Sequence, residues 1–157
     1  MSDPLNCGRR YRLFKVVDDF NREALHVEVD TSITSKWLIR IFERLRRGRG
    51  LPQILRTDNG PEFLGEAFTQ SAKSAGMAIR YIQPGKPNQN AYIERFNCTM
   101  RSELLDQHLF VRLDDVREAA YWWMQQYNED RSHESLGDMT PSEYAQSARN
   151  SSFRLSP

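Results

Sequence analysis

Two short apolar stretches near the start of the chain are separated only by a turn. The first spans residues 11–18 (YRLFKVVD), and the second spans residues 24–29 (ALHVEV), where apolar and polar side chains alternate. Residues 20–22 (FNR) read as the turn between them. A connection this short joins antiparallel strands, because parallel neighbours need a crossover of a dozen or more residues. The sequence therefore predicts a β-hairpin, and the rest of the fold has to be built onto it.

Helical and extended patterns alternate along the rest of the chain. Residues 35–47 are predicted to be helical, because Trp37, Ile41 and Leu45 recur at positions i, i+4 and i+8. Further strands are expected at residues 53–57 and 77–82, and further helices at residues 65–75, about 88–105 and 113–127. This order predicts an α/β fold with a mixed sheet packed by helices. We expect one domain over residues 1–148 and a flexible tail at residues 149–157.

The composition is that of an ordinary globular protein, with 39% hydrophobic and 27% charged residues. No apolar run approaches the roughly 20 residues of a membrane span, and no apolar stretch suited to a signal peptide follows Met1. Cys7 and Cys98 form no CxxC pair, which argues against a disulfide scaffold or a zinc site. We therefore expect a cytoplasmic protein.

The net charge is only +1, but the arginines are unevenly distributed. Five of them cluster around the end of the predicted helix 35–47, with Glu43 as the only acid among them: Arg40, Arg44, Arg46, Arg47 and Arg49. Two interpretations stay open. Cations near a helix C-terminus oppose the helix dipole, and arginines also bind DNA phosphates. We keep Arg44, Arg46 and Arg47 as candidate DNA-binding residues.

Two acidic residues occur in settings that suit chemistry. Asp58 follows the predicted strand 53–57 and opens a turn, at the edge where α/β proteins bind ligands. Glu94 lies in the predicted helix 88–105 and shares one face with Asn97 and Arg101. Taken singly, each acid is better explained as a surface turn residue or as part of a solvated helix face.

The spacing of the two acids is more specific. Thirty-five residues lie between Asp58, in TDNGPEF, and Glu94, in PGKPNQNAYIERFN. Here the sequence resembles the integrase and transposase superfamily, whose active site is written D, D-35-E. It is most similar to the second-reading-frame transposases of bacterial insertion sequences. The segments YRLFKVVDDFNREAL and YNEDRSHESLGDMTPSEYA agree with this resemblance, so four motifs occur in the family's order.

The resemblance implies an RNase H-like fold and metal-dependent DNA strand cleavage and transfer. Asp58 and Glu94 are the catalytic carboxylates that it implies, with Mg²⁺ or Mn²⁺ as cofactor. Two such ions about 3.5–4 Å apart can activate the attacking oxygen and stabilise the leaving oxygen. Mg²⁺ is a hard cation that prefers carboxylate oxygen. A water would first cut at the element end, and the freed 3′-hydroxyl would then attack target DNA.

Supporting roles are also predicted for neighbouring residues. Asn59 and Gly60 would shape the turn after Asp58, while Lys86, Asn97 and Arg101 would contact phosphate. The implied partners are double-stranded DNA, as element ends and target, and further copies of the chain. The implied location is the bacterial cytoplasm with the nucleoid, without a membrane.

The family's first aspartate has no counterpart in this sequence. In the family it lies on a strand before the one at residues 11–18, within Trp-Ser-Met-Asp-Phe-Val. Met1 falls near that valine, which would put the aspartate two residues upstream. We therefore expect the first central strand to be missing and residues 2–8 to form a loop. Without that strand, backbone groups inside the sheet would be left unpaired. Either residues 1–9 partly substitute for it, or another copy of the chain supplies a strand by swapping, or the chain is unstable.

Two functional hypotheses stay open for the chain as it stands. One is a transposase catalytic core that is inactive without its first aspartate. The other is a non-catalytic remnant that retains DNA binding or subunit association.

Overall fold

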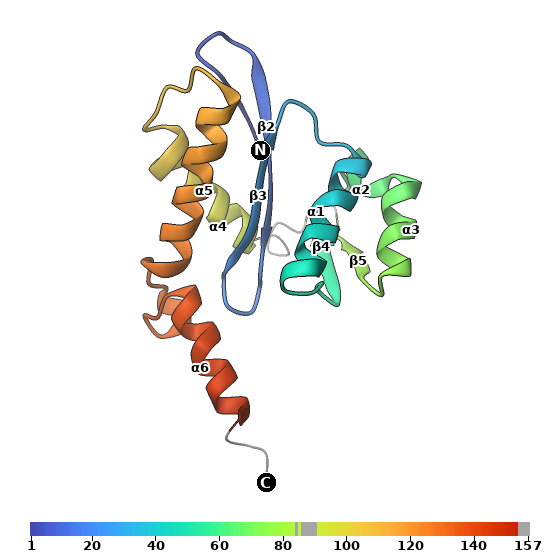
Figure 1. Cartoon of the computed structure of the whole chain (residues 1–157), viewed down its shortest axis with the longest axis vertical. Coiled ribbons are helices and arrows are strands. Elements are labelled where there is room, and N and C mark those ends of the chain that lie inside the picture. The colour runs from blue at the N-terminus through green and yellow to red at the C-terminus, as the bar shows by residue number, and fades with distance from the viewer. Residues whose placement is uncertain (84, 86–90, 154–157) are drawn as a thin grey trace. The chain divides into compact units, whose positions relative to one another are not determined.

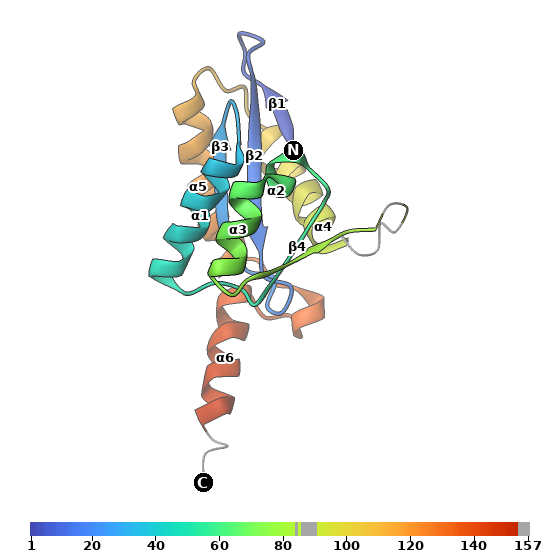
Figure 2. The same ribbon diagram turned by 90° about the vertical axis from the view of Figure 1, so that its right-hand side faces the viewer.

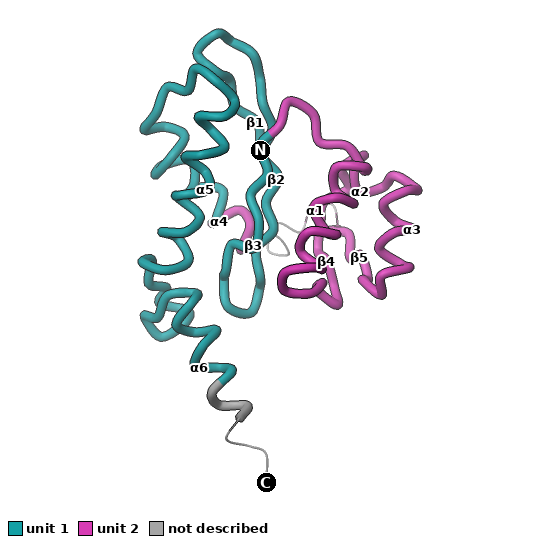
Figure 3. Tube along the Cα trace, viewed as in Figure 1, with its two compact units in different colours: residues 1–29, 96–157 teal, residues 30–95 magenta. Residues whose placement is uncertain are grey.

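The computed structural model describes residues 1–83, 85 and 91–153, with the side chains of residues 150–153 excepted. It divides into two compact units, which we describe separately (Figure 3). Unit 1 comprises residues 1–29 and 96–157, and unit 2 comprises residues 30–95. Lys86 and the predicted helix caps Asn88 and Asn90 lie outside the described residues.

Unit 1 contains a three-stranded sheet with the order β1-β2-β3 (Figures 1 and 2). Its strands are β1 (Ser2–Pro4), β2 (Arg10–Val17) and β3 (Ala24–Asp30). The turn between β2 and β3 is closed by two backbone hydrogen bonds, Asp18 N–H to Glu23 O and Arg22 N–H to Asp18 O, both 2.9 Å long. The predicted hairpin is therefore confirmed.

The expectation of a loop over residues 2–8 is wrong at its start. Ser2 pairs with Arg12 and Asp3 with Tyr11 in an antiparallel ladder. The sequence of β1 contains no β-branched or aromatic residue, so its pattern does not predict a strand. Pairing with β2 stabilises the extended conformation instead. Residues 1–4 thus provide hydrogen-bond partners for part of the backbone along one edge of β2.

Three helices and two shorter turns complete unit 1. They are the last part of α4 (Ala91–Met100), the π-helical turn η2 (Arg101–Leu105), α5 (Leu113–Glu129), η3 (Glu134–Leu136) and α6 (Pro141–Phe153). The predicted helix 88–105 therefore changes its hydrogen bonding at Arg101, whose carbonyl accepts from Asp106 N–H. Helix α6 extends past Ala148, the predicted end of the domain, and the domain boundary stays a prediction.

Helix α5 is aligned with β3 by contacts at both ends of the strand. The Arg117 guanidinium donates to Val29 O at 3.0 Å, and the Asn128 side chain bonds Ala24. Eleven helical steps and five strand steps both cover about 16 Å, so the two elements match in length. The rings of Phe96, Trp123 and Tyr127 also pack together in unit 1, with centroids 4.9–5.3 Å apart.

Unit 2 is built on two parallel strands. β4 (Ile54–Thr57) pairs with β5 (Ala78–Tyr81) from Ile54–Ala78 to Thr57–Tyr81. The connection between them contains α2 (Pro61–Leu64) and α3 (Glu66–Ser74), while α1 (Ser35–Gly48) precedes β4. The short helix α2 was not predicted, because Asn59-Gly60-Pro61 reads as a turn.

The predicted apolar stripe of α1 faces α3 within unit 2. Leu38, Ile41, Phe42 and Leu45 are buried, as expected from their helical spacing. The Phe42 and Phe68 rings lie 5.7 Å apart, and Phe63 from α2 packs edge-on against Phe68 at 6.0 Å.

The two sheets differ in strand direction. The strands are antiparallel in unit 1 and parallel in unit 2, and helices pack beside both sheets.

Candidate active site

Asp58 stands directly after the last paired residue of β4. Its side chain is exposed, and its Oδ1 accepts a hydrogen bond of 3.0 Å from Gly60 N–H. This is an Asx-type turn, which holds the carboxylate at the carboxyl end of the strand. The amide of Asn59 reaches Ile82 O at 3.5 Å, which connects the turn to the segment after β5. Asp58 and Asn59 are therefore positioned by the parallel strand pair.

A side chain on Gly60 would crowd two acidic side chains at this turn. A Cβ on Gly60 would lie 3.0 Å from Asp58 Oδ1 and 3.1 Å from Glu62 Oε2. Both carboxylates therefore approach the same point, and a larger residue would push one of them away. The predicted supporting role of Gly60 has a steric basis in this contact.

Glu62 was not singled out from the sequence. It lies in the first turn of α2 and is half-buried beside the Asp58 turn. Its place in the sequence could have indicated that it lies near Asp58. It follows Asp58 by four residues within TDNGPEF, and a helix that starts there brings the two acids together.

Glu94 is exposed in the first turn of α4. Asp58 and Glu94 both belong to unit 2. Carboxylate oxygens that are open to solvent are the donors that Mg²⁺ takes, and this ion often uses one or two protein carboxylates together with water and substrate phosphate. Within the described ranges, no group of three His, Cys, Asp or Glu residues could hold a metal. The donor chemistry of Asp58 and Glu94 therefore fits a divalent metal, with other ligands needed to complete its coordination.

Asn97 and Arg101 follow Glu94 along one side of the helix. Asn97 is half-buried, and its Oδ1 has no hydrogen-bond partner among the described residues. Arg101 pairs with Asp3 at 3.2 Å and with Asp106 at 3.6 Å. A phosphate bound by Arg101 would have to share the guanidinium with these acids.

A buried polar cluster in unit 1 was missed by sequence reasoning. It contains Tyr11 and Lys15 of β2, whose Oη and Nζ atoms are buried without a hydrogen-bond partner in the described residues. Desolvation, followed by repulsion from Arg101, lowers the pKa of Lys15 to about 7. Desolvation and the nearby Asp3 raise the pKa of Tyr11 to about 12. A lysine in the pattern YRLFKVVD gave no sign that it would be buried.

The candidate DNA-binding arginines of α1 are exposed. Arg44, Arg46 and Arg47 lie in its last turns, and Arg40 stacks over the Trp37 ring at 5.5 Å. They present guanidinium groups to solvent, as both open interpretations require.

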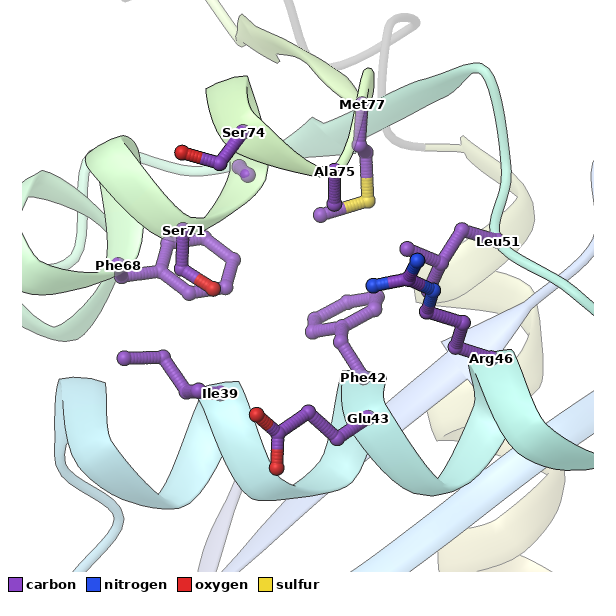
Figure 4. A pocket seen from close by; sticks show the side chains of 11 residues that line it. Ile39, Phe42, Glu43, Arg46, Leu51, Phe68, Ser71, Ser74, Ala75 and Met77 are labelled. Carbon is purple, nitrogen blue, oxygen red and sulfur yellow. The ribbon is translucent and has the colours of Figure 1, made fainter.

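Unit 2 also contains a cavity of about 160 Å³ between α1 and α3 (Figure 4). It is lined mainly by apolar side chains, with Glu43, Arg46, Ser71 and Ser74 as the polar ones. Asp58 and Glu94 do not line it. The cavity is therefore separate from the candidate catalytic carboxylates.

Comparison with known families covers almost the whole chain. Residues 2–87 match the family described as integrase core domain, and residues 75–141 match a second family of the same description. The chain belongs to the integrase core family. The matched ranges include Asp58 and Glu94, whose roles in chemistry stay predictions.

The relatives of this integrase core include proteins of bacterial insertion elements. It is 45% identical over 143 residues to the 31.7 kDa protein of insertion element IS407 from Burkholderia multivorans. It is 40% identical over 147 residues to the 39.2 kDa protein of IS476 from Xanthomonas euvesicatoria. These matches cover 91% and 94% of the chain but only 52% and 42% of the relatives, so the chain spans about half their length.

Solved structures show that the integrase core has the RNase H-like fold. The HTLV-2 integrase catalytic core in complex with magnesium, in its trimeric form, gives a TM-score of 0.70 at 20% identity. That match covers 92% of this chain and 90% of the HTLV-2 chain. The catalytic core of BIV integrase gives a TM-score of 0.68 at 18% identity, and this match covers 98% of the present chain and 95% of the BIV chain. In the described part of the chain, no helix is long and apolar enough to span a bilayer.

The motif YNEDRSHESLGDMTPSEYA, at residues 127–145, has a structural role in unit 1. Arg131 forms an ion pair with Glu103, which also accepts from Trp123 Nε1 at 3.1 Å. Thr140 and Glu143 cap the start of α6 reciprocally, with hydrogen bonds of 2.8 and 3.2 Å. The motif thus orders the connection from α5 to α6, a role the sequence pattern did not reveal.

Proposed function

We propose that this integrase core is the catalytic portion of an insertion-sequence transposase that cleaves DNA strands and joins them to target DNA. The observation that carries the proposal is the pair of exposed carboxylates, Asp58 after β4 and Glu94 in α4, both within unit 2. The family and the insertion-element relatives support it. DNA, in the bacterial cytoplasm, would be both substrate and target.

Asp58 and Glu94 would hold Mg²⁺ or Mn²⁺, with water and DNA phosphate as further ligands. When bound, such an ion supplies charge to the phosphate and lowers the pKa of a coordinated water. The Gly60 N–H bond keeps one oxygen of Asp58 in place, while the open side of the carboxylate stays available. The bound magnesium of the HTLV-2 integrase core supports this choice of ion.

DNA would be held by cationic and amide groups of the chain. Arg44, Arg46 and Arg47 are exposed, and the Asn97 amide keeps an acceptor without a partner among the described residues. Lys86 and Arg101 complete the proposed DNA-binding set, while Asn59 and Gly60 would shape the turn that carries Asp58. Because DNA binding releases counterions, affinity should fall steeply with salt.

The test is Mg²⁺- or Mn²⁺-dependent nicking of insertion-element end DNA, by this chain and by a chain extended upstream with Asp-Phe. Asp58→Asn and Glu94→Gln should each reduce nicking by at least about a hundredfold and weaken Mn²⁺ binding in calorimetry. Glu66→Gln, an exposed acid on α3, is the matched control. Full nicking by both site variants would refute these assignments.

A second candidate function is subunit association or DNA binding without catalysis. The observation that favours it is the exposed ring pair on α5, where Tyr121 and Trp122 are 53% and 59% exposed. The HTLV-2 core, which occurs in dimeric and trimeric forms, supports self-association. If neither chain nicks DNA but both bind it or form oligomers, this function replaces the first.

A further inference from the structure

The parallel strands of unit 2 place two arginines directly opposite each other. Arg56 of β4 pairs with Arg80 of β5 in the register of the sheet, and both residues are exposed. We call these two residues the arginine pair. Neighbouring strands lie about 5 Å apart, and directly opposed residues have their side chains on the same face of the sheet. Two cationic side chains therefore start close together on the surface of unit 2.

The face of the sheet that carries the arginine pair meets solvent. Along β4, Leu55 and Thr57 are buried. Ile54 and Arg56 alternate with them and are exposed. Successive side chains of a strand point to opposite faces, so only one face of β4 packs into the core. On the other face, the residues opposite Ile54 and Arg56 are an alanine and Arg80, so these strand residues carry positive charge and no negative charge.

A shared anion would relieve the repulsion within the arginine pair. Like charges that stand directly opposite each other destabilise a sheet. A guanidinium presents its N–H donors in a planar fork, which matches the oxygens of a phosphate group. Two such forks from neighbouring strands can together bind the two non-bridging oxygens of one phosphodiester. The arginine pair is thus complementary to a phosphodiester in charge and in hydrogen-bond donors.

The arginine pair lies next to the candidate catalytic carboxylate of β4. Asp58 follows Arg56 by two residues, which corresponds to about 7 Å along an extended strand. The hydrogen bond from Gly60 N–H holds the Asp58 carboxylate at this end of the strand. A DNA strand with one phosphate at Asp58 would therefore bring a neighbouring phosphate within reach of the arginine pair.

We propose that Arg56 and Arg80 together bind one phosphodiester of a DNA strand and position that strand at Asp58. They are positioning residues, because they hold a phosphate beside the reacting one. The choice of DNA as the ligand rests on the proposed function, whereas the charge of the site follows from the register of β4 and β5. Contacts to phosphate carry no sequence information, so the pair should act alike on all DNA sequences.

The experiment measures DNA binding by fluorescence anisotropy in EDTA, where no metal-dependent step contributes. The parent chain, Arg56→Gln, Arg80→Gln and the double variant are titrated with two duplexes of unrelated sequence at several salt concentrations. Each single change should weaken binding about threefold and leave the salt dependence unchanged, because the other arginine still neutralises the shared phosphate. The double change should weaken binding at least about tenfold and reduce the slope of log K against log salt by about 0.9.

Two controls separate the shared phosphate from a general loss of charge. Lys73→Gln removes an exposed cation of α3 and should leave the slope unchanged. Changing both Arg56 and Arg80 to lysine should keep the slope, because the charge stays, but lower the affinity, because the planar fork is lost. An unchanged slope in the double glutamine variant, or an equal loss in Lys73→Gln, would overturn the proposal. A reduction of about 0.9 in each single variant would indicate two separate phosphates and reject the shared site.

The parent chain offers a readout that needs no variant. The Nε–H signals of Arg56 and Arg80 in NMR spectra should shift when DNA is added, and unshifted signals would overturn the proposal.

The binding data also separate this inference from the proposed catalysis. Asp58→Asn leaves the arginine pair intact and should not remove the salt-slope effect of the double glutamine change. If that effect is present but no chain nicks DNA, the phosphate site stands and the catalytic proposal fails. If the parent chain nicks DNA and the arginine variants bind as the parent does, only the phosphate site is rejected.

Discussion

The side-chain amide of Asn128 hydrogen-bonds both backbone groups of Ala24, 104 residues away in the sequence. It accepts from Ala24 N–H at 2.8 Å and donates to Ala24 O at 3.0 Å, in a buried setting. These groups would otherwise be buried without partners at the start of β3. Asn128 therefore anchors the C-terminal end of α5 to the start of β3.

Replacing Asn128 should destabilise the chain strongly. Asn128→Leu leaves the N–H and C=O of Ala24 unpaired and should lower the free energy of unfolding by about 2–4 kcal/mol. Urea unfolding followed by circular dichroism measures this loss. Glu129→Gln changes the exposed neighbour and should stay within about 0.5 kcal/mol. Equal stability of the two variants would show that the Ala24 groups find other partners.

Lys15 should make stability depend on pH in the alkaline range. Its pKa is lowered from 10.5 to about 7 in the folded chain, so the unfolded chain binds more protons between these values. Stability should therefore rise as pH increases from about 7 toward 9.5, and this gain is absent below pH 7. Lys15→Met should flatten this slope and stabilise the chain at pH 7, whereas the exposed Lys36→Met should do neither. Unfolding midpoints at pH 7, 8 and 9.5 provide the check, below the range in which Tyr11 titrates.

Gly65 and Ser35 should show strong energetic coupling. A Cβ on Gly65 would lie 2.1 Å from Ser35 Oγ, which donates to Glu62 O at 2.7 Å. Gly65→Ala should therefore cost about 1–3 kcal/mol through overpacking. Adding Ser35→Gly removes the clashing side chain, so the double variant should lose less than the sum of the single changes. Additive losses in thermal unfolding would contradict this contact.

Gly137 should tolerate alanine less well than Gly48. Gly137 ends η3 in the left-handed region, at φ 68°, so Gly137→Ala should destabilise by about 1–2 kcal/mol. Gly48 lies in α1 with open space around its Cα, and Gly48→Ala should stabilise by up to about 1 kcal/mol. Thermal unfolding midpoints check this prediction. A lower midpoint for Gly137→Ala and a higher one for Gly48→Ala would indicate backbone strain at Gly137, whereas higher midpoints for both would indicate a general preference for alanine.

The local patterns of the sequence predicted most of the secondary structure. The hairpin at residues 11–29, the helix with Ile41 and Leu45 buried, and both strands of unit 2 are observed close to their expected bounds. The turn at Asp58 was also predicted, because Asp-Asn-Gly-Pro favours a turn whatever surrounds it. The roles of Asp58 and Glu94 in chemistry stay predictions that rest on their spacing.

The sequence by itself determined most of the elements and the family, because strand and helix periodicity is local and the motifs keep a fixed spacing along the chain. Tertiary structure decided the strand at Ser2–Pro4, the bonds of Asn128 to Ala24 and the burial of Lys15. Each of these depends on residues distant in the chain that meet only after folding. A polar side chain does not reveal in its local pattern whether folding will provide it with a partner.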